Sequence, residues 1–347
     1  METKIENIRN EEEWNNFVLK NEKSSIFHTI EWRNVISSVY GFEPVYLTAG
    51  DESNISGILP LFKIKPIWGD KKLVSLPFSY ITGPLGENEK ITKDLVNFAL
   101  NLTEKMRLNY LELRTRYPIS KETNLKEIDY YSDPILRLSP NCKEIWGKIH
   151  KNSIRRPIKK AENSGVTVKR SDDISDLQEF NRLNQVTRKK HGIPAQPFKF
   201  FQKMWEEMKD KNLMQLLLAR HDEKTIGGMI FFTFKKSIIY AYGASDPQEL
   251  NYYPNHIILW EMIKWGCENN FSEFSFGRTS PEDEGLFEFK KRWGTELLKL
   301  NYYYSKPLNP ASMDRKGWKY RMLTGTWKRL PSLVTKKLDV YMMKKIA

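Results

Sequence analysis

The chain has 347 residues, of which 40% are hydrophobic and 13% aromatic, so it is long enough for two ordinary domains and too apolar for a disordered chain. Lysine and arginine outnumber aspartate and glutamate by 56 to 43, which leaves a formal net charge of +13. This surplus favours a polyanionic partner such as RNA, an anionic membrane surface or a pyrophosphate-bearing substrate, although a merely soluble basic protein would also carry it.

No stretch has the pattern of a targeting or membrane-spanning segment. The longest apolar runs, at 229–234 and 237–242, have the length of strands and fall far short of the roughly 18 residues of a membrane span. Residues 1–14 are acidic and polar, unlike a secretory signal. We therefore expect a cytoplasmic protein.

The sequence also lacks the motifs of several common enzyme classes. Cys142 and Cys267 are far apart and show no zinc-type spacing, so we expect idle thiols and neither a metal site nor a disulfide. The five histidines form no metal-type cluster. No G-x-S-x-G, P-loop, HExxH or dinucleotide fingerprint is present. We expect no metal and no resident cofactor.

Comparison of the chain with itself reveals a repeat. Each copy has a hairpin of two strands, a third strand, an amphipathic helix and a short strand that ends in Arg-Thr. The predicted elements lie at 45–49, 55–59, 73–76, 95–106 and 110–115 in the first copy and at 216–219, 226–230, 238–242, 258–266 and 274–279 in the second. The repeat predicts two similar α/β domains and not one large sheet.

The join between the two copies is expected near 132–141, which contains two prolines. A helix that begins near Ile145 should end or kink at Pro157, because proline lacks an amide donor and clashes with the preceding turn. The stretch Asn163-Ser164-Gly165 predicts a helix stop before a strand at 166–169. We therefore expect domains at 1–138 and 139–308, with the cleft that holds the chemistry in the second.

Residues 309–347 form a basic tail with interleaved apolar residues. Such a basic amphipathic segment can lie on an anionic membrane or on RNA. A C-terminal helix docked on the second domain is the alternative. If the tail does contact lipid, the protein would be peripheral to the inner face of the membrane.

The stretch 274–294 combines a strand end, a polar loop and a short amphipathic segment. This segment is expected to bury Leu286, Phe289 and Trp293, which places Lys290 beside an aromatic anchor. A lysine so placed can stabilise the oxyanion that develops when an amine attacks an ester, an effect often worth about 3 kcal/mol. A solvated lysine is the alternative.

Several short motifs follow one another in a fixed order along the chain. They are Trp32, YGFEP at 40–44, LPL at 59–61, SLPF at 75–78, GP at 83–84, NSIRR at 152–156, KAENSGV at 160–166, FGR at 276–278 and FKxxWG at 289–294. Over roughly residues 25–307 this set resembles the FemAB-type proteins, which are peptidoglycan interpeptide-bridge aminoacyltransferases and their relatives.

The resemblance implies an α/β (α+β) chain of two tandem acetyltransferase (GNAT)-like domains, each a mixed twisted sheet flanked by helices, in agreement with the repeat. Members that build cell walls transfer an amino acid from aminoacyl-tRNA to an amine on a peptidoglycan precursor. The glycyl-adding members carry a long helical hairpin in the second half, and no such arm fits this sequence. Relatives outside bridge synthesis share the motifs, so the acceptor is open.

The resemblance also implies roles for individual residues. Lys290 would assist the tetrahedral intermediate or the leaving ribose hydroxyl, and Phe289 would line the same channel. Tyr240 and Tyr242 resemble tyrosines that face the substrate cleft, with core packing as the alternative. Arg188 matches an anion-binding arginine.

Two further residues complete the candidate substrate-binding set. They are Trp32 of the first motif and Arg278 of FGR, for which a structural salt bridge is the alternative role. An acyl-CoA-dependent member of the fold normally presents an Arg/Gln-x-x-Gly-x-Gly/Ala loop at a helix start. The nearest candidate, KKHGIP at 189–194, lacks the last small residue, and its proline removes an amide donor.

These observations lead to one expected function and two rivals. We expect an aminoacyltransferase that uses aminoacyl-tRNA and an amine-bearing envelope precursor, with Lys290 in a crevice between the two halves. An acyl-CoA-dependent N-acyltransferase acting on a sugar or peptide amine keeps the fold and changes the donor. A non-catalytic RNA- or membrane-binding module is the third hypothesis.

Overall fold

The computed structural model describes residues 4–51, 54–65, 70–307, 324–325 and 327–346. The chain divides into two compact units. The first comprises Met1–Tyr131, Lys299–Asp314 and Lys344–Ala347, and the second comprises Ser132–Leu298 and Arg315–Met343.

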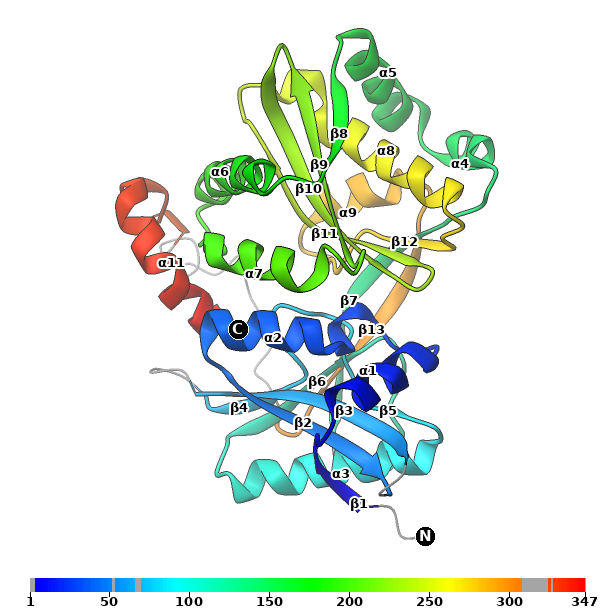
Figure 1. Ribbon diagram of the computed structural model, residues 1–347, viewed down its shortest axis with the longest axis vertical. Helices are drawn as coiled ribbons and strands as arrows, with labels where there is room; N and C mark the ends of the chain where they lie inside the picture. Colours follow the sequence, from blue (N-terminus) through cyan, green and yellow to red (C-terminus); the bar gives the residue numbers. More distant parts are fainter. Residues whose placement is uncertain (1–3, 52–53, 66–69, 308–323, 326, 347) are drawn as a thin grey trace. The chain divides into compact units, whose positions relative to one another are not determined.

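The first unit is a mixed sheet with helices on both faces (Figure 1). Its strand order is β1-β2-β3-β4-β6-β13, with the short β5 against β3, and only β4 and β6 run parallel. One face carries α3, and the other carries α1 and α2, where Trp14 packs on Tyr46. The elements are β1 Lys4–Asn7, α1 Glu11–Lys20, a 3-10 turn Ile26–His28, α2 Ile30–Tyr40, β2 Glu43–Gly50, β3 Ile55–Ile64, β4 Lys72–Val74, β5 Leu85–Gly86, α3 Glu89–Lys105, β6 Tyr110–Thr115 and β13 Glu296–Tyr304.

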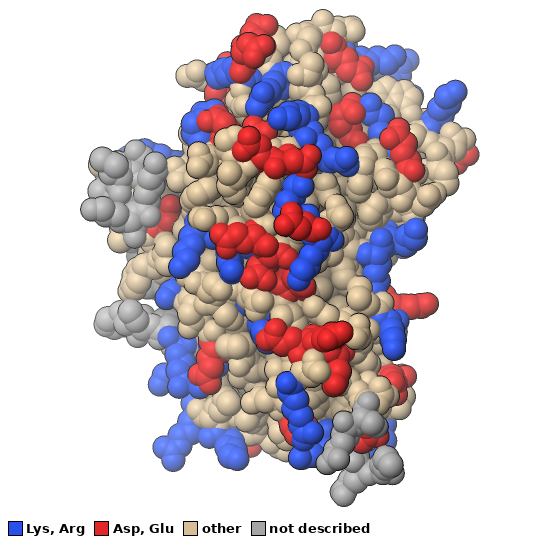
Figure 2. Space-filling model, in the orientation of Figure 1, with Lys and Arg blue, Asp and Glu red and all other residues tan. Residues whose placement is uncertain are grey.

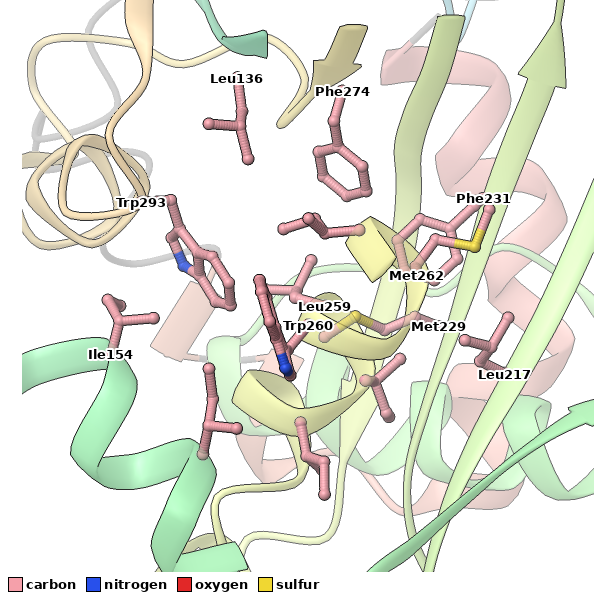
Figure 3. Packing of buried hydrophobic residues seen from close by; sticks show 14 of the residues in the cluster. Leu136, Ile154, Leu217, Met229, Phe231, Leu259, Trp260, Met262, Phe274 and Trp293 are labelled. Carbon is pink, nitrogen blue, oxygen red and sulfur yellow. The ribbon is translucent and has the colours of Figure 1, made fainter. Parts of the chain in front are cut away.

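The second unit repeats this plan, with strand order β7-β12-β11-β10-β9-β8 and only β11 and β12 parallel. Helix α8 covers one face, over the core cluster that Figure 3 shows around Trp260 and Trp293, and α6 and α7 cover the other. The elements are β7 Lys126–Arg137, α4 Cys142–Lys148, a π-helical turn Lys151–Arg155, α5 Arg156–Asn163, β8 Thr167–Ser171, α6 Ile174–His191, α7 Phe198–Met208, β9 Met214–His221, β10 Lys224–Phe234, β11 Ser237–Ser245, a 3-10 turn Leu250–Tyr252, α8 Pro254–Glu268, β12 Glu273–Ser275, α9 Glu284–Lys291 and α11 Ser332–Ile346.

The predicted repeat is confirmed, because each unit has a hairpin, a third strand, a helix and a strand parallel to the third. The predicted strand at 274–279 is shorter than expected, since β12 ends at Ser275 and the chain continues as a loop. Pro157 does not end a helix as predicted. It is the second residue of α5, which continues directly from the π-helical turn Lys151–Arg155, and α4 has already ended at Lys148. The stop at Asn163 is confirmed, with Gly165 at φ +78°.

The structure divides the chain differently from the boundaries expected at 138 and 308. The end of β7, Ile135–Arg137, pairs with β12 in the second unit. Residues Asn301–Tyr304 of β13 pair with β6 in the first unit. Each sheet is therefore completed by a strand that the hydrophobic pattern alone assigns to the other half.

The described part of the C-terminal tail includes α11, whose residues up to Met343 belong to the second unit. Trp327, Thr335 and Asp339 are buried, and the Asp339 carboxylate accepts a hydrogen bond from the Ala195 amide at 3.1 Å. This agrees with a docked helix. The basic residues expected at 315–321 lie outside the described residues.

No helix in the described ranges is long and apolar enough to span a membrane. On the face shown in Figure 2, lysine and arginine alternate with aspartate and glutamate, so the basic surplus is not gathered into one patch there.

Candidate active site

Helix α9 carries Lys290 and is anchored at both ends. Asp283 caps its start by accepting the Leu286 amide at 3.3 Å. Beyond its end, the fully buried Trp293 contacts Phe276 and Phe289 at ring-centroid distances of 5.7 and 6.3 Å. The predicted burial of Leu286 is wrong: it lies in the first turn of α9, away from the core that Phe289 and Trp293 contact, and is 39% exposed.

The Lys290 ammonium is held inside the second unit. Lys290 is only 4% exposed, and its Nζ donates to the Gly277 carbonyl and to Thr279 Oγ1, both at 2.8 Å. An ammonium has three donors. Among the described residues the third has no partner. The solvated-lysine alternative is therefore excluded.

Burial lowers the pKa of Lys290 to about 8, against the opposing effect of the Asp133 and Asp283 carboxylates. The nearby Arg278 guanidinium also lowers this pKa. The group is thus largely charged at neutral pH and loses its proton just above it.

The two acceptors for Lys290 are fixed by the backbone. Gly277 has φ +75°, a conformation that favours glycine, and its amide donates to Ser275 Oγ at 3.0 Å. Thr279 exchanges backbone hydrogen bonds with Ser132, at 3.1 and 2.8 Å. Ser275 Oγ in turn donates to Asp133 Oδ1 at 2.6 Å. We call Gly277 and Thr279 the acceptor pair.

A β-bulge in β11 separates the two candidate tyrosines. Tyr240 pairs with Phe231 and Tyr242 with Ile230, so Ala241 has no partner in the ladder. The regular alternation expected from the sequence would place both rings on one face, but the extra residue turns them to opposite faces. Tyr240 packs towards the α8 core and Tyr242 against Phe201 of α7, at 5.4 Å.

Arg188, in the last turn of α6, lies near both tyrosines. Burial lowers the pKa of its guanidinium, while Tyr242 and Tyr240 act in the opposite direction. Burial raises the pKa of Tyr240 to about 12, although Arg188 opposes that rise. Arg188 thus lies within electrostatic reach of Tyr240 and Tyr242. The role of these three residues in binding stays a prediction.

A cavity of about 220 Å³ adjoins Arg188 between α6 and the tail. Trp327, Thr335 and Asp339 line it from the tail side. Burial raises the pKa of Asp339 to about 6. The sequence pattern did not single out these residues, and the only signal for them was the apolar spacing of the tail.

The remaining two candidates differ in their distance from the Lys290 ammonium. Arg278 is partly exposed and stands between the two members of the acceptor pair. Trp32 belongs to the first unit, where it is fully buried and packs edge-on against Phe27 at 5.1 Å. Their assignment to substrate binding stays a prediction.

Residues 148–291 match the family model of the acetyltransferase (GNAT) domain. The chain is 24% identical over 200 residues to a UDP-N-acetylmuramoylpentapeptide-lysine N(6)-alanyltransferase of Weissella viridescens, which covers 57% of this chain and 52% of that protein. It is 32% identical over 118 residues to a lipid II:glycine glycyltransferase of Staphylococcus haemolyticus, covering 30% of this chain and 28% of that one. The chain thus matches about half the length of the first relative and less of the second.

Among solved structures, the crystal structure of FemX superimposes with a TM-score of 0.69 and 15% identity, over 90% of this chain and 99% of that chain. At this identity the likeness concerns the fold. The resemblance to FemAB-type transferases is confirmed. The fold of two tandem GNAT-like units is confirmed with it.

The GNAT match extends over every candidate residue of the second unit. These are Arg188, Tyr240, Tyr242, Arg278, Phe289 and Lys290. The sequence reasoning missed Asp133, Ser275 and Thr279, because Asp133 and Ser275 are 142 positions apart in the chain and meet only through the pairing of β7 with β12.

Proposed function

We propose that the protein transfers an aminoacyl group from aminoacyl-tRNA to an amine of a peptidoglycan-type envelope precursor, on the cytoplasmic side of the membrane. The observation that carries the proposal is the buried Lys290 ammonium, two of whose donors are fixed by the acceptor pair while the third is left over. A preformed donor in a site shielded from water is what an oxyanion needs.

The reaction needs no covalent enzyme intermediate. The acceptor amine attacks the ester carbonyl, a C–N bond forms, and the C–O bond to the ribose breaks. The proton lost by the amine ends on the leaving ribose hydroxyl, through a substrate group or water. Lys290 donates to the carbonyl oxygen as its negative charge grows, a contribution of about 3 kcal/mol, and binding of both substrates supplies proximity.

The loop between β11 and α8 supports a donor other than acyl-CoA. In CoA-dependent members of the fold, amides at a helix start hold the pyrophosphate, and this loop leads into the start of α8. Here the loop carries Asp246 and Glu249, which pair with Lys224, and α8 begins at Pro254. The amides of Tyr252 and Tyr253 already donate to carbonyls within the loop. An anionic pyrophosphate would meet two carboxylates and few available donors.

The stretch 189–194, which the sequence offered as the nearest CoA loop, cannot serve as one. It is the end of α6 and not a helix start, and the Gly192 amide caps the helix by donating to the carbonyl of Lys189. The negative end of a helix dipole repels phosphate.

The names of the relatives support the choice of acceptor. One is named for adding alanine to the lysine of a muramoyl pentapeptide precursor, and the other for adding glycine to lipid II. Within the described residues the longest helix of the second unit is α6, with 18 residues, so no long helical arm like that of the glycyl-adding members extends from it. We therefore favour an amino acid other than glycine.

The exposed basic residues of the tail supply a second part of the proposal. Lys328, Arg329 and Lys344 are exposed on the described part of the tail. We propose that they contact anionic lipid headgroups and hold the enzyme near a membrane-bound acceptor.

The test is transfer by the purified protein from a mixture of radiolabelled aminoacyl-tRNAs to UDP-MurNAc-pentapeptide or lipid II, with products identified by mass spectrometry. We expect a labelled precursor whose mass increases by one amino acid. A parallel arm supplies acyl-CoA and titrates CoA thioesters by calorimetry. Acyl transfer from CoA, with no transfer from tRNA, would overturn the proposed donor.

One observation favours a second candidate. The match of residues 148–291 to the GNAT acetyltransferase domain is consistent with an acyl-CoA-dependent N-acyltransferase on a sugar or peptide amine. The CoA arm of the same experiment decides between the two.

A further inference from the structure

Asp133 is fully buried and lies beside the acceptor pair without belonging to it. Its two neighbours in β7, Ser132 and Pro134, form backbone hydrogen bonds with residues 276–279. Ser132 exchanges two backbone hydrogen bonds with Thr279, and the Pro134 carbonyl accepts from the Phe276 amide at 2.9 Å. These bonds hold the backbone on both sides of Asp133 against residues 276–279, two of which are the acceptor pair of Lys290.

A short chain of hydrogen bonds joins the carboxylate to the ammonium. Ser275 Oγ donates to Asp133 Oδ1 at 2.6 Å and accepts from the Gly277 amide at 3.0 Å. The Gly277 carbonyl then accepts from Lys290 Nζ at 2.8 Å. The Gly277 amide and carbonyl belong to consecutive peptide groups, so this chain fixes the position of the carbonyl that accepts from Lys290.

Among the charged groups that act on Lys290, Asp133 has the largest electrostatic effect. A buried carboxylate is costly unless a cation compensates it. The other groups that act on Lys290 are Asp283, which is exposed at the start of α9, and Arg278, whose positive charge acts against the ammonium. Water screens Asp283 more than it screens the buried Asp133.

We propose that Asp133 is a positioning residue for the transferase site, which holds Lys290 charged and in place through Ser275 and Gly277. Its catalytic consequence rests on the proposed function, whereas its effect on the ammonium can be measured without any substrate. The proposal assigns a role to a strand that follows the first repeat in the chain and completes the sheet of the second unit.

The experiment follows the titration of Lys290 by NMR in protein labelled at lysine Cε, with Lys290→Arg to assign the signal. Asp133→Asn keeps the size of the side chain and an acceptor oxygen for Ser275 while it removes the charge. In this variant we expect the titration midpoint of Lys290 to fall by about one pH unit. This is the lower limit of the shift that a nearby opposite charge usually causes. An unchanged midpoint in a folded variant overturns the proposal.

Ser275→Ala is the matched variant, because it breaks the chain of hydrogen bonds and leaves the carboxylate charged. We expect a smaller fall of the midpoint than in Asp133→Asn. Circular dichroism verifies the fold of each variant. If Asp133→Asn does not fold, Ser275→Ala alone decides, since a midpoint equal to that of the unchanged protein contradicts the proposal.

The kinetic readout separates this inference from the function on which it rests. For Asp133→Asn we expect kcat to fall more at pH 8 than at pH 6.5, with KM unchanged, because a smaller share of Lys290 stays protonated at pH 8. A shifted midpoint in a protein that shows no aminoacyl transfer would refute the proposed function and leave the role of Asp133 standing. Equal losses of kcat at both pH values would contradict the inference.

Discussion

Burial and hydrogen bonding act on Lys290 in ways that a sequence motif shows only in part. The FKxxWG pattern and its aromatic residues single out this lysine from the sequence alone. The acceptor pair could not be identified in this way. Thr279 is held by Ser132, a residue of β7 that lies far from it in the sequence. Chemistry that depends on long-range strand pairing is not visible in local spacing.

The pH dependence of transfer follows from the lowered pKa of Lys290. The proton that Lys290 donates is present below its pKa of about 8, so we expect its contribution to be lost as pH rises through that value. Single-turnover rates between pH 6 and 9.5 measure this. Lys290→Arg is the comparison, since a guanidinium stays charged throughout the range. A ratio of the two rates that does not change across pH 8 would contradict the assignment.

At the scale of single elements, the sequence predicted the strands and the helix of each repeat, but not the helices α1, α2, α6 and α7 or the irregularities of the strands. The bulge at Ala241 cannot be predicted from the sequence of β11, because Tyr240 and Tyr242 have the i, i+2 spacing of two residues on one face of a regular strand. Pro157 likewise fits a helix end and a helix start equally well from sequence alone. Which of the two occurs depends on where the preceding helix already stopped, at Lys148.

The bulge gives a prediction about Gly243. A Cβ at this position would come within 2.0 Å of the Tyr240 hydroxyl, so Gly243→Ala must displace that ring. We expect a loss of about 1–3 kcal/mol in the free energy of unfolding, typical of an overpacked site, measured by urea denaturation.

A matched control exists in α4, where a Cβ at Gly147 meets no atom within 4 Å. Gly147→Ala should leave the stability unchanged or raise it by about 0.5–1 kcal/mol. Combining Gly243→Ala with Tyr240→Phe should recover part of the loss. If the two alanine variants are equally stable, the packing described for Tyr240 is incorrect.

At the scale of the whole molecule, the repeat read from the sequence gave the number of domains and their type, but not their boundaries. Residues of β13 complete the sheet of the first unit although they follow the whole second repeat. No local signal distinguishes a strand that pairs with its neighbour in sequence from one that pairs with a distant copy.

This arrangement predicts that a substitution in β13 destabilises the first unit. Tyr303 is buried in the core of the first unit, and its hydroxyl accepts from the Ile119 amide at 3.1 Å. Tyr303→Ala should cost about 3–5 kcal/mol and remove hydrogen-exchange protection from β2, β3 and β6. Tyr303→Phe should cost about 1 kcal/mol. Loss of protection in β9 and β10 instead would contradict the assignment of β13 to the first unit.

The most direct test of the account compares single-turnover transfer from aminoacyl-tRNA by three proteins at pH 7. Lys290→Ala removes the buried ammonium, and Lys291→Ala removes the exposed lysine next to it. We predict that Lys290→Ala lowers the rate about 100-fold or more, with little change in acceptor binding, while Lys291→Ala transfers as fast as the unchanged protein. Equal rates for all three proteins would contradict the claim that the Lys290 ammonium stabilises the transition state.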